Sequence, residues 1–292
     1  PVEMAVVDDM GKDVPGTERV VEIISREHDL AINNVPRAAF VSFSRDCSFY
    51  GTFSDKSVTP DQLAAQVRMD PNKFNRVEAM RMLTDIERTK LVADINSEIS
   101  GAWLETFGLI VKDQALSPGL KASLLGIEEQ SLNRDLMPLY RERYNARSKL
   151  MKAAAEKYMD DLKALFSTTD TYSRGESPVD GLEERRLKAV VLRILTEVGT
   201  DAVRTLAEEH FHKAWNFSDR TSALHCINTG GHPRRLGLLS EAFEAWKSHI
   251  NGYSTYLSII SSGIHDDVFE MIAAEEKREM FRIQHPSHSR AL

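Results

Sequence analysis

Residues 187–227 read LKAVVLRILTEVGTDAVRTLAEEHFHKAWNFSDRTSALHCI and contain three apolar stripes separated by short breaks. The first stripe follows the i, i+3, i+4, i+7, i+8, i+11 spacing of one helix face, and its members are Leu187, Val190, Val191, Ile194, Leu195 and Val198. Gly199 is expected to end this helix. Thr200 or Asp201 is expected to cap the next one.

The second and third stripes follow after equally short breaks. The second contains Val203, Leu206, Ala207, His210, Phe211 and Trp215. Residues 216–219 interrupt it, and Ala223, Leu224 and Ile227 begin the third. Successive amphipathic helices with short joints pack as antiparallel neighbours. The stretch therefore predicts a packed helical array, and it carries no catalytic motif.

The composition is that of a soluble, folded protein of 292 residues, with 42% hydrophobic and 28% charged side chains. The net charge of −7 is spread over a mixed surface, so no nucleic-acid partner is expected. No apolar run reaches the roughly 18–20 residues of a membrane span, and no signal peptide is recognisable. We therefore expect no membrane association and a cytoplasmic location. Cys47 and Cys226 lie far apart, which favours two buried free thiols over a disulfide.

Both ends of the sequence look cut. The chain starts with Pro1-Val2-Glu3-Met4, without an initiator methionine and apparently inside a strand, and it stops at residues 289–292 on the way into a helix. We expect a fragment of a longer protein.

The first fifty-odd residues predict β-structure. Candidate strands are residues 4–7, 20–24, 29–33, 38–43 and 47–50, with a turn at 8–11. Such short strands need a partner sheet or the following helices to bury their side chains. The composition changes at residues 51–60, and no convincing strand follows.

From Thr59-Pro60 onward the sequence predicts helices, because threonine caps a helix and proline favours its first position. Predicted helices, besides those of the opening stretch, are 61–69, 74–86, 103–111, 118–125, 138–166, 236–250, 253–260 and 268–281. Residues 167–178 predict a flexible loop and residues 230–233 a shorter one. The result is a solenoid-like stack of irregular repeats without a fixed period.

The residues that could carry chemistry form no recognised catalytic group. No histidine is followed by glutamate, so the His-Glu-x-x-His motif of zinc hydrolases is missing. His210 and His212 project about 200° apart on a helix and cannot share one metal without other help. We expect a half-buried His210 beside an exposed His212. His285 and His288 have helical spacing, but Pro286 is expected to prevent them from facing one another. There is no Gly-x-Ser-x-Gly elbow and no phosphate loop. Trp103, Trp215 and Trp246 are interpreted as core residues.

Five motifs resemble the C-terminal helical domain of bacterial-type aminopeptidase N and the end of the domain before it. Residues 211–219 with Ala223-Leu224 resemble Phe-x-x-Ala-x-Asn-Met-Thr-Asp…Ala-Leu. Residues 74–79 resemble Phe-x-Arg-Trp-Asp/Glu-Ala, and residues 113–124 resemble Asp-x-x-Leu-x-Pro-x-Leu-x-Ala. Arg185 with Leu187, Leu192 and Leu195 fits Arg-x-Leu-x-x-x-x-Leu-x-x-Leu. Residues 36–50 resemble the strand pair that closes a β-sandwich with Phe-Ser-Ala-Pro-Val.

The motifs come in the order of the family and cover nearly the whole chain, but several positions depart from it. Val77 replaces a tryptophan and Ala189 an asparagine. Arg45-Asp46-Cys47 replaces Ala-Pro-Val, and Gly126-Ile127 replaces Leu-Pro. The sequence is similar to a divergent member of the family.

The resemblance implies a mainly α fold with a small N-terminal β portion. Residues 1–53 would form part of an antiparallel β-sandwich, and residues 54–292 most of an irregular α-solenoid. The catalytic domain, with Gly-Ala-Met-Glu-Asn and His-Glu-x-x-His-x18-Glu, would precede Pro1, and the last helices would follow Leu292. This chain would then carry no catalytic residue, metal or cofactor of its own and would be inactive alone.

For the full-length parent, the resemblance implies a zinc metallopeptidase that removes N-terminal amino acids from peptides. Its zinc activates the water that attacks the first peptide bond. The helical domain would pack with its own catalytic domain, enclose the active-site chamber and limit access to short or unfolded peptides. Residues 285–292 resemble Asn-Pro-Asn-x-x-Arg, which makes Arg290 a candidate for contacts with peptide carboxylates or carbonyls.

Two other interpretations stay open on the residues alone. The chain could be a stand-alone helical scaffold that binds a protein partner in its concave face. A solvated arginine near the end of the sequence is the simpler interpretation of Arg290. A small hydrolase in its own right has no nucleophile and base to support it.

Overall fold

The computed structural model describes residues 1–27, 29–33, 35, 38–51, 57–127, 136–169, 177 and 179–291. It divides into two compact units, Pro1–Asp161 and Leu162–Leu292, called here the N-terminal and C-terminal units. The fold is mainly α with a small antiparallel sheet at its N-terminus, as predicted. The predicted domain boundary between residues 53 and 54 stays a prediction. None of the described helices has both the length and the apolar character needed to cross a bilayer.

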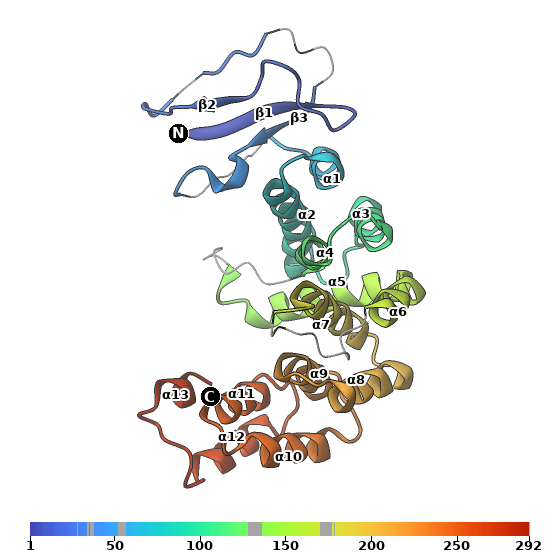
Figure 1. Cartoon of the computed structure of the whole chain (residues 1–292), viewed down its shortest axis with the longest axis vertical. Helices are drawn as coiled ribbons and strands as arrows, with labels where there is room; N and C mark the ends of the chain where they lie inside the picture. Colours follow the sequence, from blue (N-terminus) through green and yellow to red (C-terminus); the bar gives the residue numbers. More distant parts are fainter. Residues whose placement is uncertain are drawn as a thin grey trace. The chain divides into compact units, whose positions relative to one another are not determined.

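The sheet has the strand order β2-β1-β3, formed by β1 Val2–Asp8, β2 Arg19–Val21 and β3 Ala38–Phe43 (Figure 1). Both partners run antiparallel to β1, with Val2 opposite Val21 and Met4 opposite Phe43. Because β1 lies at the centre of the sheet, its residues 4–7 are apolar on both faces and buried.

Two of the predicted strands are wrong. Residues 29–33 form no strand, and most of their side chains are exposed. Residues 47–50 also form none, because the chain turns sharply in a 3₁₀ helix, η1 Arg45–Cys47. Ser44, Asp46 and Cys47 all have positive φ there, at 57°, 53° and 55°, which an extended strand does not allow.

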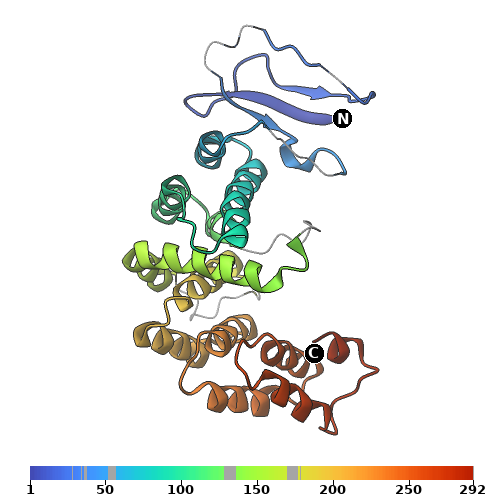
Figure 2. The same ribbon diagram turned by 180° about the vertical axis from the view of Figure 1, so that it is seen from behind.

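Helices α1 Pro60–Met69 and α2 Lys73–Ala93 follow the sheet, and Figure 2 shows them from behind. Thr59 closes a capping box with Gln62, and Pro60 occupies the first turn, as the sequence predicted. The remaining helices that lie within this unit are α3 Gly101–Lys112, α4 Pro118–Leu125 and α5 Tyr140–Lys157. Helix α2 packs against α1, α4 and α5, so it forms the centre of the unit.

The single long helix predicted for residues 138–166 is wrong. The chain leaves helical geometry at Tyr158, with φ −121° and ψ 29°, and resumes in α6 Met159–Thr168. At this break the Tyr158 hydroxyl donates to the Leu104 carbonyl at 2.9 Å. Its ring lies against Gly108 of α3, where a Cβ atom would come within 2.2 Å of it.

The C-terminal unit contains α7 Leu182–Thr196, α8 Asp201–Lys213 and α9 Phe217–Thr229, which are the three helices predicted from residues 187–227. Gly199 lies between the first two at φ 65°, and Thr200 is the N-cap residue of α8. Helix α9 packs against both α7 and α8. The buried face of α7 also includes Leu192, because α7 has neighbours on more than one side.

The unit continues with α10 Arg235–Trp246, α11 Ile250–Ser261, α12 Val268–Glu276 and α13 Pro286–Ala291 (Figure 1). Helices α10 and α12 end several residues earlier than predicted. Helix α11 packs against α9, α10, α12 and α13 and is the centre of this part. The loop predicted for residues 167–178 lies largely outside the described residues.

Candidate functional site

Arg290 lies on α13 with its side chain exposed. It makes no hydrogen bond or ion pair with any described residue. The guanidinium is therefore accessible, but nothing in the described part of the chain orients it. Its substrate role stays a prediction.

His285 and His288 face one another, contrary to the sequence prediction. Their ring centroids lie 4.6 Å apart. Pro286 does not separate them, because it occupies the first residue of α13, where a helix tolerates proline. The buried His288 also packs edge-on against Tyr253 of α11, with centroids 5.1 Å apart. This cluster was missed because the prediction placed the proline inside a helix.

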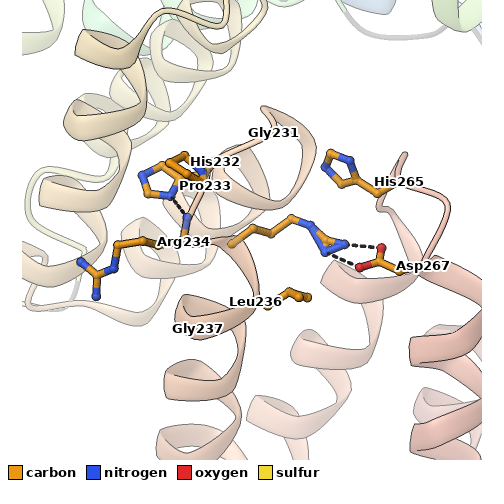
Figure 3. A pocket seen from close by; sticks show the side chains of 9 residues that line it. Gly231, His232, Pro233, Arg234, Leu236, Gly237, His265 and Asp267 are labelled. Carbon is orange, nitrogen blue, oxygen red and sulfur yellow. Dashed lines mark hydrogen bonds and ion pairs between the residues drawn. The ribbon is translucent and has the colours of Figure 1, made fainter.

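A pocket of about 420 Å³ opens at the turn between α9 and α10 (Figure 3). Its wall consists of the loop and first turn at residues 231–237, together with His265 and Asp267 from the segment before α12. Gly231 has φ 64°, a conformation that favours glycine at this turn. The sequence predicted the loop at 230–233 but not the pocket, because His265 and Asp267 follow this loop by more than 30 residues in the sequence.

His232 is held in one tautomer at the edge of this pocket. The backbone N–H of Arg234 donates to His232 Nδ1 at 3.1 Å, so the ring proton is on Nε2 (Figure 3). That nitrogen lies 3.2 Å from Oε2 of Glu208 on α8. Burial lowers the pKa of His232 below its ordinary value, which keeps the ring neutral near pH 7.

The arginines of the pocket are paired with carboxylates. Arg235 donates to both oxygens of Asp267, one at 3.3 Å, and thereby ties the start of α10 to the start of α12. Arg234 extends away from His265 and Asp267 in Figure 3 and pairs with Glu208. His265 Nε2 lies 2.9 Å from the Asn228 carbonyl. The charged side chains that line the pocket thus connect neighbouring helices. They contain no pair of a nucleophile and a base.

The histidines of α8 are separated as the helical geometry predicted. His210 is fully buried rather than half-buried, with 0% of its surface exposed. The centroids of its ring and of the Phe166 ring lie 5.3 Å apart. His212 points to the surface and lies 3.2 Å from Glu241 of α10. Over the described ranges, no group of three or more His, Cys, Asp or Glu side chains is placed to hold a metal ion.

The interpretation of the tryptophans and cysteines is partly right. Trp103 and Trp246 are buried core residues, and Trp103 Nε1 donates to Thr84 at 3.0 Å. Trp215 is only half-buried and lies beside the Arg185 guanidinium. Cys226 is a buried free thiol, but Cys47 is exposed because it lies on the 3₁₀ turn.

Residues 60–292 match a protein family described as a domain of unknown function (DUF3458_C) with ARM repeats. The chain belongs to this family. The family is the C-terminal domain of the aminopeptidase N family, so the resemblance carried by the five motifs is confirmed. No curated protein sequence matches the chain.

Among solved structures, the chain is similar to the crystal structure of Legionella pneumophila aminopeptidase A in complex with aspartic acid. The TM-score is 0.85 at 18% sequence identity. The superposition covers 100% of this chain and 35% of that protein, so the chain spans about a third of its length. At this identity the similarity shows a shared fold.

Proposed function

We propose that this chain is the non-catalytic C-terminal portion of a zinc-dependent aminopeptidase that removes N-terminal amino acids from peptides. In this proposal the helical domain encloses the active-site chamber and limits which peptides reach it. The observation that carries the proposal is the family match over residues 60–292. The order of the five sequence motifs agrees with it.

The described residues do not fit a catalytic zinc site. Zinc takes three or four His, Cys, Asp or Glu ligands at short distance, and no such group exists over the described ranges. In this proposal the zinc is held by a catalytic domain outside this chain, and that domain would be the partner of the helices. The cytoplasmic location stays a prediction within this proposal.

Arg290 is the residue of this chain that we propose to contact substrate. Its guanidinium is exposed and is not occupied by any described carboxylate. Its fork of donors suits a peptide carboxylate or carbonyl. In a chamber, this contact would position a peptide without taking part in bond cleavage.

The first test measures metal content and turnover of the chain by itself. We expect no stoichiometric zinc by elemental analysis and no cleavage of an aminoacyl reporter. One tightly held zinc per chain, or measurable turnover, would refute the proposal.

The gene provides a second test, because an upstream reading frame with a His-Glu-x-x-His domain is expected. Translation that begins near Pro1 would instead favour a stand-alone scaffold.

A third test addresses Arg290 in the full-length enzyme. Arg290→Ala should change kcat/KM for peptides and leave the zinc content unchanged. Arg186→Ala is the matched control, because Arg186 is an exposed arginine on α7. Equal kcat/KM values for Arg290→Ala and the unaltered enzyme across several peptides would exclude the substrate role.

A further inference from the structure

Helix α13, described over Pro286–Ala291, has two buried side chains, His288 and Ala291. Its contacts are with α11, where Ser261 donates to the Ala291 carbonyl and Tyr253 receives the His288 ring. His288 is therefore one of the side chains that join α13 to α11.

The His288 ring is bound in a single protonation state. The Arg282 backbone N–H donates to His288 Nδ1 at 3.1 Å, so Nδ1 is the acceptor and Nε2 carries the proton. His288 is only 4% exposed, and Nε2 finds no acceptor in the described part of the chain. The ring packs edge-on against Tyr253 and stacks with Phe281, where the ring centroids lie 5.9 Å apart.

A second proton would destroy this arrangement. Protonated Nδ1 becomes a donor that faces the Arg282 N–H, so the hydrogen bond is lost and two donors oppose one another. The new charge would be buried, and the nearby Arg282 and His285 disfavour it. Burial first, and then these two neighbours, lower the pKa of His288 from its ordinary value.

The other ionisable groups around His288 do not offset this charge. Tyr253 of α11 donates its hydroxyl to Glu275 of α12 at 3.1 Å. Glu275 also accepts from Arg278 at 2.8 Å and is therefore already paired. Arg290, on α13 itself, would add positive charge.

We propose that His288 is a pH-sensitive latch, which holds α13 against α11 while the imidazole is neutral and releases the helix when the imidazole is protonated. Since the folded state binds the second proton less readily than the open state, the latch is complete above the ordinary histidine pKa of about 6.5. It weakens as the pH falls below that value. Release would also displace Arg290, and this consequence alone rests on the proposed function.

Metal binding is a competing explanation for the two adjacent histidines, and the hydrogen bond to Nδ1 argues against it. A metal ion needs a lone pair on the ligating nitrogen. With Nδ1 accepting from Arg282, His288 Nε2 holds the proton and has no lone pair to give.

Hydrogen–deuterium exchange on the full chain, corrected for the intrinsic effect of pH, tests the latch. Protection of residues 282–291 should fall between pH 7.5 and 5.5, while protection of α1 at residues 60–69 should not. At low pH the protection factor of these residues should have fallen tenfold for each unit by which the pKa of His288 in the closed state lies below its ordinary value. Constant protection of residues 282–291 over this range would overturn the proposal.

Variants identify the sensor. His288→Asn offers a carbonyl oxygen to Arg282 and does not titrate, so protection should no longer depend on pH. His285→Gln and the exposed His249→Gln should both keep the acid loss. A full acid loss in His288→Asn would overturn the proposal.

The asparagine side chain is shorter and would leave α13 open at every pH if it cannot reach Arg282. NMR titration of the His288 ring in the unaltered chain therefore gives an independent measurement. The ring of the closed state should titrate below the ordinary histidine value of about 6.5, at the pH where the loss of protection levels off. A ring that titrates at or above about 6.5 would overturn the latch. If the ring titrates below that value as expected while Arg290→Ala leaves peptide kinetics unchanged, the latch stands and only the proposed substrate role fails.

Discussion

The joint between sheet and helices in the N-terminal unit differs sharply from the α7–α9 layer in the C-terminal unit. The joint is built from hydrogen-bonded polar side chains: Asp13, Ser42, Arg45, Asp70 and Asn75. The layer is built from apolar side chains, with a few charged groups enclosed among them. Both regions bury polar atoms, and those of the joint form a connected network.

In the joint, each polar atom has a specific partner. Ser42 accepts from Arg45 Nε and from the Asn75 amide and donates to Asp70 at 3.0 Å. Arg45 also holds both oxygens of Asp13, at 2.8 and 2.6 Å. A completed network of this kind fixes one geometry between strand and helix.

In the layer, the buried charges depend on the packing around them. Lys188 donates to the Thr169 carbonyl at 2.8 Å and lies 4.6 Å from the centroid of the Phe166 ring. His210 packs against the same ring. We therefore expect apolar contacts to determine the stability of the layer and hydrogen bonds to determine that of the joint.

The largest effect is expected from removing an apolar side chain of the layer. Leu195 is 0% exposed, so Leu195→Ala should lower the free energy of unfolding by about 2–5 kcal/mol through lost burial and the cavity left behind. Leu182→Ala on the same helix is the matched control, because Leu182 is 59% exposed and its loss should stay within about 0.5 kcal/mol. Urea unfolding measures both, and equal losses would refute apolar control of the layer.

The next effect is a loss of stability in acid. Burial lowers the pKa of His210 from 6.5 to about 4, so the folded state binds fewer protons than the unfolded state between these values. The contribution of neutral His210 to the free energy of unfolding is fully present above pH 6.5. It falls as the pH drops toward 4, by up to about 3 kcal/mol.

His210→Gln should therefore flatten the pH dependence of the unfolding free energy, and the exposed His212→Gln on the same helix should not. Urea unfolding at pH 7, 5.5 and 4 measures this. A pH profile that is the same in His210→Gln and the unaltered chain would show that other groups cause the acid loss.

The layer could be predicted from the sequence because its signal is local. The stripe from Leu187 to Val198 has helical spacing, and Gly199 marks its end, so neighbouring residues contain the information. The motif resemblance then identified the family. The break at Tyr158 has no such signal, because it accompanies a contact with Leu104 and Gly108 on another helix.

The joint and the pocket could not be predicted for the same reason. Arg45 and Asp13 lie 32 residues apart, as do Arg235 and Asp267. No periodic pattern links residues at such distances, so an ion pair between them follows only from the completed fold. The departure of residues 45–47 from Ala-Pro-Val was visible, but the sequence did not show that Arg45 would join Asp13 and Ser42 in a polar network.

The smallest effects are expected in the joint, and two variants of Asp70 separate hydrogen bonding from charge. Asp70 Oδ1 accepts from Ser42 and from the Asn72 N–H at 2.8 Å. Asp70→Ala leaves these donors without an acceptor and should cost about 1–3 kcal/mol. Asp70→Asn keeps that oxygen, and the amide of Gln66, which donates to Oδ2 at 3.0 Å, can rotate to present its own oxygen.

Charge makes a second difference between the two variants. Burial raises the pKa of Asp70, so its ionised form is held less favourably in the folded than in the unfolded chain, and that penalty is present above the folded pKa. Asp70→Asn removes the penalty and should lie within about 0.5 kcal/mol of the unaltered chain at pH 7. Urea unfolding at that pH decides the point. If Asp70→Asn costs as much as Asp70→Ala, the negative charge rather than the hydrogen-bond network holds the joint, and the contrast with the apolar layer fails.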